Sequence, residues 1–281
     1  MEIGEFLRAR RARIQPSDVG LPAGGRRRVP GLRREELAQL AGVSVDYYTR
    51  LEQGRTPTVS DAVLDAIARA LRLTAAESAH LRRLVRPART TRTPRARAQT
   101  VRPELRRLLE MMRDVPAFVL GRRMDVLALN PLGAAVTGFS PDASPNTARH
   151  TFLDPTARDF YPEWDRVAEE TVAYLRLDAG RHPDDPALAA LVGELSMRSQ
   201  EFRTLWARQE VREKTSGRKL IRHPLIGDLD LRYETLAVHS DEDQLLVTYT
   251  AEAGSPTETA LRQLADWSLV EAAGREVLEG P

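Results

Sequence analysis

The sequence predicts two domains of different fold class, an all-α N-terminal domain followed by an α+β C-terminal domain. Apolar residues recur at helical spacing as far as Val85, whereas beyond residue 103 they change to the alternation of short strands. The charge changes at the same place. Residues 1–107 contain 23 arginines and no lysine against 11 acidic residues, and the rest of the chain contains 19 basic and 29 acidic residues. This asymmetry indicates a basic module for a polyanion and a separate acidic module.

Length and composition bound the class of protein. At 281 residues the chain is long enough for about two domains. The absence of cysteine excludes disulfides and thiolate metal sites and fits a reducing compartment. The N-terminal stretch has no apolar core of the kind that signal peptides carry, and no segment approaches the roughly 20 apolar residues of a membrane span. We therefore expect a cytoplasmic protein without a membrane span.

Five short helices are expected in the N-terminal domain. The first, fourth and fifth are marked by apolar positions on one face: Ile3, Phe6 and Leu7; Val63, Leu64, Ile67, Ala68 and Leu71; Leu81, Leu84 and Val85. Thr74 and Glu77 have the spacing of a capping box that starts the fifth helix. The second and third helices are expected at 33–41 and 45–53, with Ser44 as the N-cap of the third.

The second and third helices have the spacing of a helix-turn-helix motif, with Gly42 in the turn. The expected core-facing residues are Leu37, Ala38, Leu40, Tyr48 and Leu51. With that face buried, the outward stripe of the third helix consists of Val45, Asp46, Thr49 and Arg50. A helical stripe of this width suits a major groove. An ordinary αα-hairpin would allow each feature alone, but their joint spacing and the charge excess favour a DNA reader.

A basic segment separates the two domains. Residues 86–103 contain six arginines, three prolines and no acidic residue, so they should not fold alone and are typical of a linker, which could also lie along phosphates. We expect a helix-turn-helix domain at 1–86, a basic linker at 87–103, the α+β domain at 104–270 and a C-terminal tail at 271–281.

Strand patterns bracket a helical centre in the second domain. The predicted elements are strands at 118–120 and 126–129, helices between 156 and 212 with breaks at Pro162 and 180–186, strands at 229–235 and 245–250, and a final helix from Ser255 that includes Leu261, Leu264 and Trp267. Apolar and charged residues alternate in 229–235, so this strand should have one buried and one solvated face.

Long stretches of the sequence resemble known families. GLRREELAQLAGVSVDYYTRLEQGR, within residues 1–85, resembles the lambda-repressor-like, Xre-type helix-turn-helix domains. The stretches NTAR at 146–149, LRLDAGRHPDDPALAALVGELSMRSQEFRTLW, HPLIGDLDLRYETL and DQLLVTYTAEAGS are similar to the MmyB-like transcription regulators. In that family a DNA reader precedes a PAS-like ligand-binding domain. The resemblance implies an all-α lambda-repressor-like helix-turn-helix domain followed by an α+β PAS-like domain.

The resemblance also implies a set of DNA contacts. The implied DNA-binding residues are Arg34, Ser44, Val45, Asp46, Thr49, Arg50 and Arg55. The outward stripe of the third helix matches base-reading positions, while Ser44, Arg34 and Arg55 match phosphate-contacting positions. The family's LWxxH pattern appears here with Gln209 in place of the histidine.

We expect no catalytic residue, no metal site and no cofactor. The five histidines form no HxxxH or HExxH pair. Asp154, Asp159 and Glu163 could form an acid/base group, but Asp154 precedes Pro155 as an N-cap would, which favours a helix-capping turn. No glycine-rich phosphate loop precedes a helix, and no nucleophile elbow is present. The sequence therefore gives no support to an enzyme.

Aromatic residues of the second domain could line a ligand pocket or could simply form its core. The candidate pocket residues are Phe118, Phe152, Tyr161, Trp164, Phe202 and Trp206, with Phe160 among the same aromatic set. The family resemblance favours the pocket.

We interpret the chain as a bacterial, dimeric transcriptional regulator. Its partners would be double-stranded operator DNA and a small apolar or fatty-acid-like ligand that the second domain senses. One alternative is an antitoxin-like protein whose second domain is a protein-interaction scaffold, which a cavity filled by its own side chains would favour. The other alternative is an enzyme with an appended reader, which the missing constellation of polar groups argues against.

Overall fold

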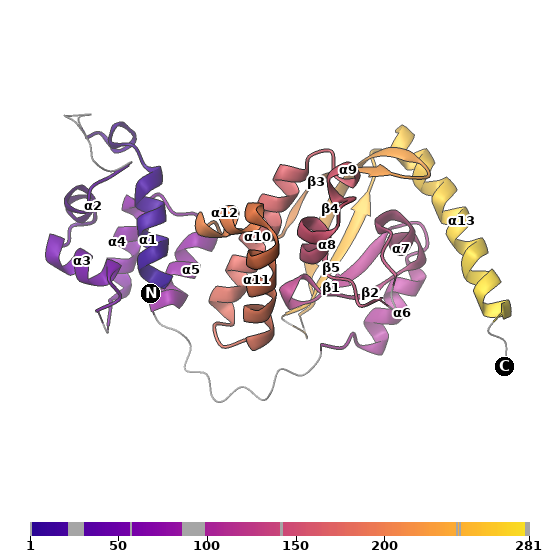
Figure 1. Cartoon of the computed structure of the whole chain (residues 1–281), viewed down its shortest axis with the longest axis horizontal. Helices are drawn as coiled ribbons and strands as arrows, with labels where there is room; N and C mark the ends of the chain where they lie inside the picture. The colour runs from indigo at the N-terminus through magenta and orange to yellow at the C-terminus, as the bar shows by residue number, and fades with distance from the viewer. Residues whose placement is uncertain are drawn as a thin grey trace. The chain divides into compact units, whose positions relative to one another are not determined.

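The structure, a computed structural model, consists of two compact units, and Figure 1 shows the whole chain. The described residues are 2–21, 31–56, 58–85, 99–140, 143–239, 241 and 243–278. The first unit comprises Met1–Pro94, Val172–Asp185 and Thr204–Glu213. The second unit comprises Arg95–Thr171, Pro186–Arg203 and Lys214–Pro281. We call Val172–Asp185 and Thr204–Glu213 the insert segments, because they interrupt the chain of the second unit.

The N-terminal part of the first unit contains the expected α-helices. They are α1 (Glu2–Arg13), α2 (Arg34–Ala41), α3 (Val45–Glu52), α4 (Asp61–Ala70) and α5 (Ala75–Val85), with a 3-10 turn at Pro16–Val19. The predicted capping box starts α5. Its two hydrogen bonds run from Thr74 N to Glu77 Oε2 at 2.7 Å and from Glu77 N to Thr74 Oγ1 at 3.3 Å.

One glycine and one serine set the turn between α2 and α3. Gly42 has a φ of 66°, in the left-handed region that glycine adopts without steric cost, and it ends α2. Ser44 begins α3, because its Oγ accepts a hydrogen bond from Tyr47 N at 3.1 Å. The two helices are therefore separated by the short turn that the sequence predicts.

The core of the first unit confirms most of the expected inward positions. Leu37, Ala38 and Tyr48 have no exposed surface, and Leu51 is buried as well. Leu40 was expected on the core side, but its side chain is exposed. Successive residues of a helix turn by about 100°, so Leu40, three positions after the buried Leu37, lies at the edge of the apolar face rather than in its centre.

The insert segments complete this core. Leu177 from the first segment and Val211 from the second are buried in the same apolar cluster as Phe6 and Leu7 of α1. The two segments also hold each other, because the Arg176 guanidinium lies 3.6 Å from the centre of the Trp206 ring and donates a hydrogen bond to its backbone oxygen. A helix-turn-helix fragment ending near residue 86 would lack these apolar contacts.

Arg10 of α1 is the main polar contact to the insert segments. Its side chain is buried, its Nη1 lies 2.7 Å from Glu77 Oε1 of α5, and its Nη2 donates to the Gln209 backbone oxygen at 2.5 Å. Arg13 adds a partly exposed pair with Glu210, at 3.6 Å. Burial lowers the pKa of Arg10, and the Glu77 carboxylate acts in the opposite direction. A buried guanidinium of this kind needs both of its partners to remain inside the protein.

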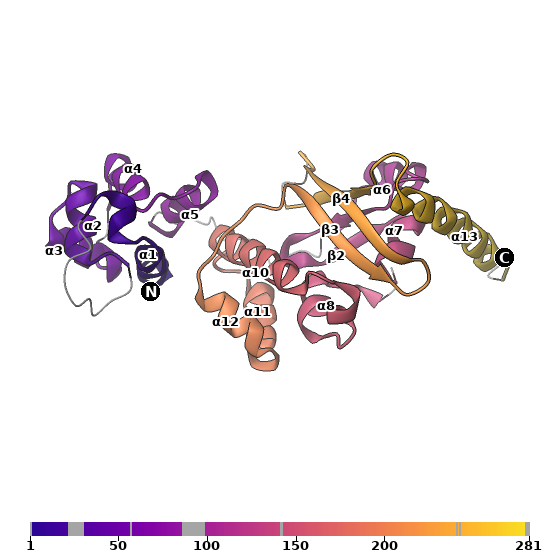
Figure 2. The same cartoon turned by 90° about the horizontal axis from the view of Figure 1, so that it is seen from above.

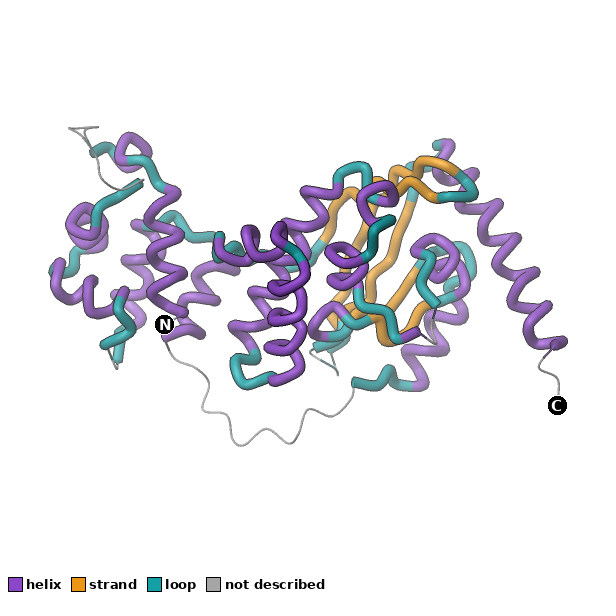
Figure 3. The backbone as a smooth tube through the Cα atoms, in the orientation of Figure 1, coloured by secondary structure: helices purple, strands orange, loops and turns teal. Residues whose placement is uncertain are grey.

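The second unit is built on a five-stranded antiparallel sheet with the order β2-β1-β5-β4-β3. Its strands are β1 (Ala117–Leu120), β2 (Val126–Leu129), β3 (Ser216–His223), β4 (Gly227–Ala237) and β5 (Leu245–Thr250). Figure 2 shows β3 and β4 side by side, and Figure 3 shows the strands between purple helices. The predicted strands are all present, and β3 is the strand that the sequence did not predict.

The register of β4 follows its pattern of apolar residues. Leu229, Leu231 and Tyr233 are buried, while the charged residues between them are exposed, as the alternation predicts. β3 carries Arg218, Lys219 and Arg222, so its apolar alternation is too weak to stand out. Its pairing with β4 supplies the hydrogen bonds that its composition does not predict.

α-Helices precede, separate and follow the strands along the chain. They are α6 (Pro103–Met111), α7 (Pro131–Thr137), α8 (Thr147–Leu153), α9 (Ala157–Phe160), α10 (Trp164–Arg181), α11 (Pro186–Arg198), α12 (Gln200–Ala207) and α13 (Pro256–Leu278). The helices between 156 and 212 and the breaks at Pro162 and within 180–186 were predicted, whereas the break between α11 and α12 and the helices α6, α7 and α8 were not. On α13, Leu261 and Leu264 are buried but Trp267 is exposed, so Trp267 is not part of the core face.

The expected domain boundaries at 86, 103 and 270 remain predictions. Most of the predicted linker, residues 86–98, lies outside the described residues. α13 continues to Leu278 and so extends into the expected C-terminal tail.

His80 on α5 is buried against the insert segments. Among the described residues, none forms a hydrogen bond with its Nδ1. Its ring packs edge-on against Phe6 at 5.2 Å, and a Cβ atom built on Gly180 would lie 2.4 Å from it. Burial lowers the pKa of His80 to about 4, and the charges of Arg83, Arg176 and Arg10 act in the same direction. The imidazole is therefore neutral at neutral pH.

This depressed pKa predicts a pH dependence of stability. Because the folded-state pKa lies below the unfolded value of about 6.5, the contribution of neutral His80 is fully present above pH 6.5 and is lost as the pH falls towards 4. Between pH 7 and 5 the protonation of His80 should lower the free energy of unfolding of the first unit by on the order of 2 kcal/mol. In His80→Gln this part of the pH dependence should be absent, which urea titration at several pH values measures. His239→Gln, at an exposed histidine, should leave the slope unchanged. Equal slopes in all three proteins would contradict the assignment to His80.

Candidate functional site

The outward stripe of α3 is exposed as the sequence predicts. Val45, Asp46 and Arg50 are exposed, and Thr49 is half-buried beside them. Asp46 and Arg50 form an ion pair at 3.4 Å along the helix. Such an exposed pair is weak, so DNA could compete for the Arg50 guanidinium at little cost.

The three expected phosphate contacts differ in their freedom. Ser44 caps the N-terminus of α3, where free backbone N–H groups and the helix dipole favour an anion. Arg55 follows α3 and is exposed. Arg34 is half-buried, and its Nη2 lies 2.8 Å from Glu52 Oε1. A phosphate at Arg34 would therefore have to share the guanidinium with a carboxylate.

Glu52 is the centre of the first unit's polar network. Its side chain is 1% exposed, and its carboxylate contacts Arg11 Nε of α1 at 3.2 Å and Arg34 Nε of α2 at 2.9 Å. Arg11 also donates to the Leu32 backbone oxygen at 2.6 Å. One carboxylate thus joins the last turn of α3 to the two helices that flank it.

This role of Glu52 was not predicted from the sequence. Glu52 follows the inward anchor Leu51, and a charged residue beside an apolar anchor is more often exposed. Two signals could have identified it: Arg11 continues the apolar face of α1, and Gly4 has no side chain where α1 approaches α3. A Cβ atom on Gly4 would lie 2.1 Å from the Glu52 backbone oxygen.

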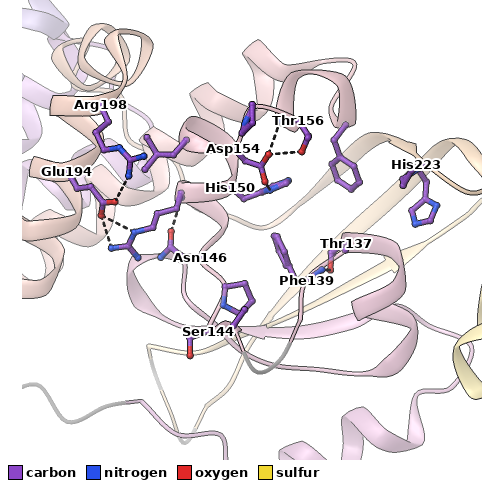
Figure 4. A pocket seen from close by; sticks show the side chains of 18 residues that line it. Thr137, Phe139, Ser144, Asn146, His150, Asp154, Thr156, Glu194, Arg198 and His223 are labelled. Atoms are coloured by element: carbon purple, nitrogen blue, oxygen red, sulfur yellow. Dashed lines mark hydrogen bonds and ion pairs between the residues drawn. The ribbon is translucent and has the colours of Figure 1, made fainter. Parts of the chain in front are cut away.

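The second unit contains a cavity of about 720 Å³ among α7, α8, α11 and the end of β3 (Figure 4). Its lining includes the apolar residues Phe139, Leu153, Pro155, Phe160 and Pro224. Polar groups converge from two sides, with His150 and Asp154 on one and the Arg149–Glu194–Arg198 group on another. The size and the mixed lining are those of a small-molecule site.

His150 is the most constrained polar group of this cavity. Burial lowers its pKa, and this outweighs the neighbouring Asp154 carboxylate, 3.2 Å from Nδ1, which acts in the opposite direction. A neutral His150 then donates from Nδ1 to Asp154, whose own pKa is lowered first by a hydrogen bond from Thr156. The His150 Nε2 is left as an acceptor, and no described residue donates to it.

The edge of the cavity carries the opposite charge. Arg149 and Arg198 both contact Glu194, at 2.9 and 3.3 Å. Two guanidinium groups share one carboxylate, so this edge keeps a net positive charge. Hydrogen bonds from both arginines lower the pKa of Glu194, which therefore stays ionised.

The six candidate pocket residues do not gather around this cavity. Phe152 contacts Trp164 at 5.8 Å and Phe202 at 5.1 Å between ring centres, in an edge-to-face cluster. Three others lie elsewhere: Phe118 against Tyr249, Tyr161 against Phe160 and His150, and Trp206 against Arg176 in the first unit. None of the six lines the 720 Å³ cavity, whereas Phe160 does. Aromatic composition alone did not distinguish core packing from a cavity wall.

A buried lysine of the second unit was also missed. Lys219 of β3 is buried near the rings of Tyr161 and Tyr233, with Glu170 Oε2 4.0 Å from its Nζ. Burial lowers the pKa of Lys219 to about 7, and the nearby Lys214 adds to this. Lys219 lies in the strand that the sequence did not predict, which is why it was overlooked.

Two stretches of the chain match known families. Residues 101–264, more than half of the chain, match the family described as MmyB-like transcription regulator ligand binding domain. The chain belongs to the MmyB-like transcription regulators. Residues 2–81 of this MmyB-like regulator match a helix-turn-helix domain. No curated protein matches the chain.

The family match and the fold agree on a DNA-binding transcription regulator. A helical helix-turn-helix region precedes an α+β ligand-binding domain, as the resemblance implied. Within the described residues of this MmyB-like regulator, no helix combines the length and apolar character needed to cross a membrane. In the same part of the chain, no three His, Asp or Glu side chains are grouped as a metal site would require.

The Glu52 network predicts a large effect of a small substitution. Glu52→Gln removes the charge that two guanidinium groups share and leaves the buried Arg11 without its counter-ion. We expect the free energy of unfolding of the first unit to fall by about 3 kcal/mol. The control Glu35→Gln, at an exposed position in the first turn of α2, should cost no more than about 1 kcal/mol. Chemical denaturation of both variants tests this, and equal costs would contradict the central role of Glu52.

Proposed function

We propose that this regulator reads a double-stranded operator through α3 and changes its affinity when a small amphipathic ligand occupies the 720 Å³ cavity. The main support for this proposal is that one unit presents a surface suited to DNA and the other a cavity suited to a small ligand. The stripe of Val45, Asp46, Thr49 and Arg50 is open to a groove, and the cavity combines apolar walls with a cationic edge. A bacterial, cytoplasmic regulator is the setting that we propose for this pair of partners.

Different residues would contact the phosphates and the base edges of the DNA. Arginines that contact phosphate supply affinity without sequence information, while side chains at base edges supply the sequence preference. Arg55 and the capped N-terminus of α3 are suited to the first task, and Arg50 is suited to the second. The arginine-rich composition of residues 1–107 favours the long-range attraction of such a reader to DNA.

A single reader offers one eight-residue helix to the groove. Useful specificity then calls for two readers that meet half-sites about 34–36 Å apart, or a multiple of that distance. We therefore include a homodimer in the proposal. The basic linker, as a tether without a folded core, would set reach rather than angle.

The ligand class follows from the cavity. Phe139, Leu153 and Phe160 would contact an apolar body, and the two arginines at the edge would attract an acidic head group. The His150 Nε2 acceptor would favour a ligand that also carries a hydroxyl or amide donor. A fatty-acid-like molecule or another amphipathic acid fits these requirements.

The rival scaffold function has one observation in its favour. Three of the aromatic residues expected to line a pocket, Phe152, Trp164 and Phe202, are packed against one another, as they would be in a domain that binds protein. The cavity beside α8 favours the small-molecule sensor. We propose no enzyme activity, because a bound ligand accounts for the apolar wall and the cationic edge of the cavity.

The DNA contacts predict two kinds of loss. Arg50→Ala should cost roughly 1–3 kcal/mol on the preferred operator and should relax the choice of base. Arg55→Ala should weaken binding to every sequence alike and reduce the salt dependence by about one counter-ion. Selection of an operator from random DNA, followed by titration at several salt concentrations, measures both. Arg232→Ala, at an exposed arginine of β4, serves as the control. An equal loss on operator and random DNA for Arg50→Ala would refute α3 as the base reader.

The cavity predicts a binding site for an anionic amphiphile. We expect 8-anilinonaphthalene-1-sulfonate to bind there with increased fluorescence, because it combines an aromatic body with an acidic group. Leu153→Trp should fill the cavity and weaken binding at least tenfold, which corresponds to about 1.4 kcal/mol. Leu236→Trp, at an exposed position outside the cavity, should bind the probe as the parent does. Unchanged affinity in the Leu153 variant would place the probe elsewhere.

A further inference from the structure

The insert segments belong to the ligand-binding part of the chain by sequence and to the helix-turn-helix unit by structure. They lie within residues 101–264, which match the ligand-binding family. They are nevertheless built into the compact unit that contains the helix-turn-helix. The ligand-binding part of the sequence thus supplies a wall of the DNA reader.

α1 connects this wall to the recognition helix. On one side of α1, Arg11 contacts the carboxylate of Glu52, the last residue of α3, and Gly4 allows the two backbones to approach. On another side, Arg10 donates to the Gln209 backbone oxygen, and Phe6 packs in the same apolar cluster as Leu177 and Val211. The seating of α1 on the insert segments therefore bears on the position of α3.

The His80 ring lies so close to Gly180 that position 180 has no room for a side chain. A Cβ atom at position 180 would lie 2.4 Å from both Cε1 and Nδ1 of the imidazole, closer than real Cβ atoms approach other atoms. Gly180 has no backbone need to be glycine, because it lies in the last turn of α10. Glycine lowers the stability of a helix by about 1 kcal/mol relative to alanine, so its presence here indicates that close packing is required.

This contact is also poorly balanced in charge. His80 faces Arg10 from α1, Arg83 from its own helix and Arg176 from the insert segment, while Glu77 pairs with Arg10. No described residue accepts a hydrogen bond from the Nε or Nη2 of Arg83, both of which are buried. A buried polar group without a partner costs free energy that separation of the contact would recover. The insert segments are therefore held by shape, by apolar contact and by the bonds from Arg10 and Arg13, against the cost of the buried Arg83 atoms.

The helix that carries the first insert segment begins at the cavity helix. Trp164, the first residue of α10, donates from Nε1 to the Thr151 backbone oxygen of α8 at 2.9 Å. α8 also carries Arg149, His150 and Leu153 of the cavity lining. α10 runs as one helix from Trp164 to Arg181, so the residue that contacts α8 and Gly180 belong to the same element.

We propose that the insert segments are the regulatory contact of this protein: their seating on α1 and α5 holds α3 in its DNA-reading position, and occupation of the cavity alters that seating through α10. This rests on the proposed function, because it specifies how the ligand and the operator are coupled. The outward stripe of α3 stays exposed while the segments are seated, so the seated state is the one that binds DNA. Unseating lowers affinity by loosening α1 and α3.

Gly180→Ala tests the contact, with Gly193→Ala in α11 as its matched control. Both replace a helical glycine, but a Cβ atom at 193 meets nothing within 4 Å. In the full-length protein we expect Gly180→Ala to raise hydrogen exchange at the backbone amides of α3 and to weaken operator binding about fivefold or more, the lower end of ordinary allosteric coupling. Gly193→Ala should leave both quantities unchanged. Adding His80→Ala to Gly180→Ala makes room for the Cβ and should restore part of the loss.

A second variant distinguishes loss of the contact from misfolding of the protein. Glu210→Arg places like charges opposite Arg13 at a partly exposed position, so it should weaken the seating without disturbing the core. It should change α3 exchange and operator affinity in the same direction as Gly180→Ala, while the circular dichroism spectrum stays that of the parent. Unchanged α3 exchange in both variants overturns the proposal. Because hydrogen exchange is measured without DNA, that result is distinct from a failure of the parent protein to bind an operator.

Discussion

The Glu52 carboxylate is the interaction on which the DNA reader depends. It contacts Arg11 of α1 and Arg34 of α2, so the last residue of α3 is fixed to both of the neighbouring helices by charge-assisted hydrogen bonds. α3 is only eight residues long, and a helix of that length is unstable alone. Tyr48 and Leu51 supply its apolar anchoring, while Glu52 fixes its direction. The exposed stripe can therefore be presented rigidly by a helix that has almost no stability of its own.

Sequence reasoning predicted the fold of the first unit well because its signals are local. Gly42 in the turn, Ser44 at the N-cap and the capping box at Thr74 each act within four residues. The same reasoning missed β3, whose strand character comes from pairing with β4 rather than from its own residues. It also missed α8, where the Asn146 side chain caps two backbone N–H groups but the helix extends over only seven residues. Short elements held by distant contacts have weak local signals.

The two candidate sites differ in the same way, because one depends on local sequence signals and the other on tertiary contacts. The outward stripe could be predicted, because the inward anchors of one helix determine what its other face presents. The cavity could not, because its lining comes from α7, α8, α11 and β3, and their approach is a tertiary property. Phe152, Trp164 and Phe202 looked like pocket residues because of their composition, yet they fill space against one another. Whether an aromatic ring lines a cavity depends on what packs against it, which neither residue type nor spacing records.

Gln209, where the chain departs from the family's histidine pattern, can be understood from the contacts of the first unit. Its φ of 57° turns the backbone oxygen to where it accepts from Arg10 Nη2, so this bond uses the main chain and does not depend on the side chain. The side chain itself makes only a long contact from Nε2 to Glu5, at 3.4 Å. A substitution of the side chain here leaves the bond from Arg10 Nη2 intact. What the position cannot lose is its backbone conformation, since Arg10 would otherwise lose its acceptor from the insert segments and keep its contact with Glu77.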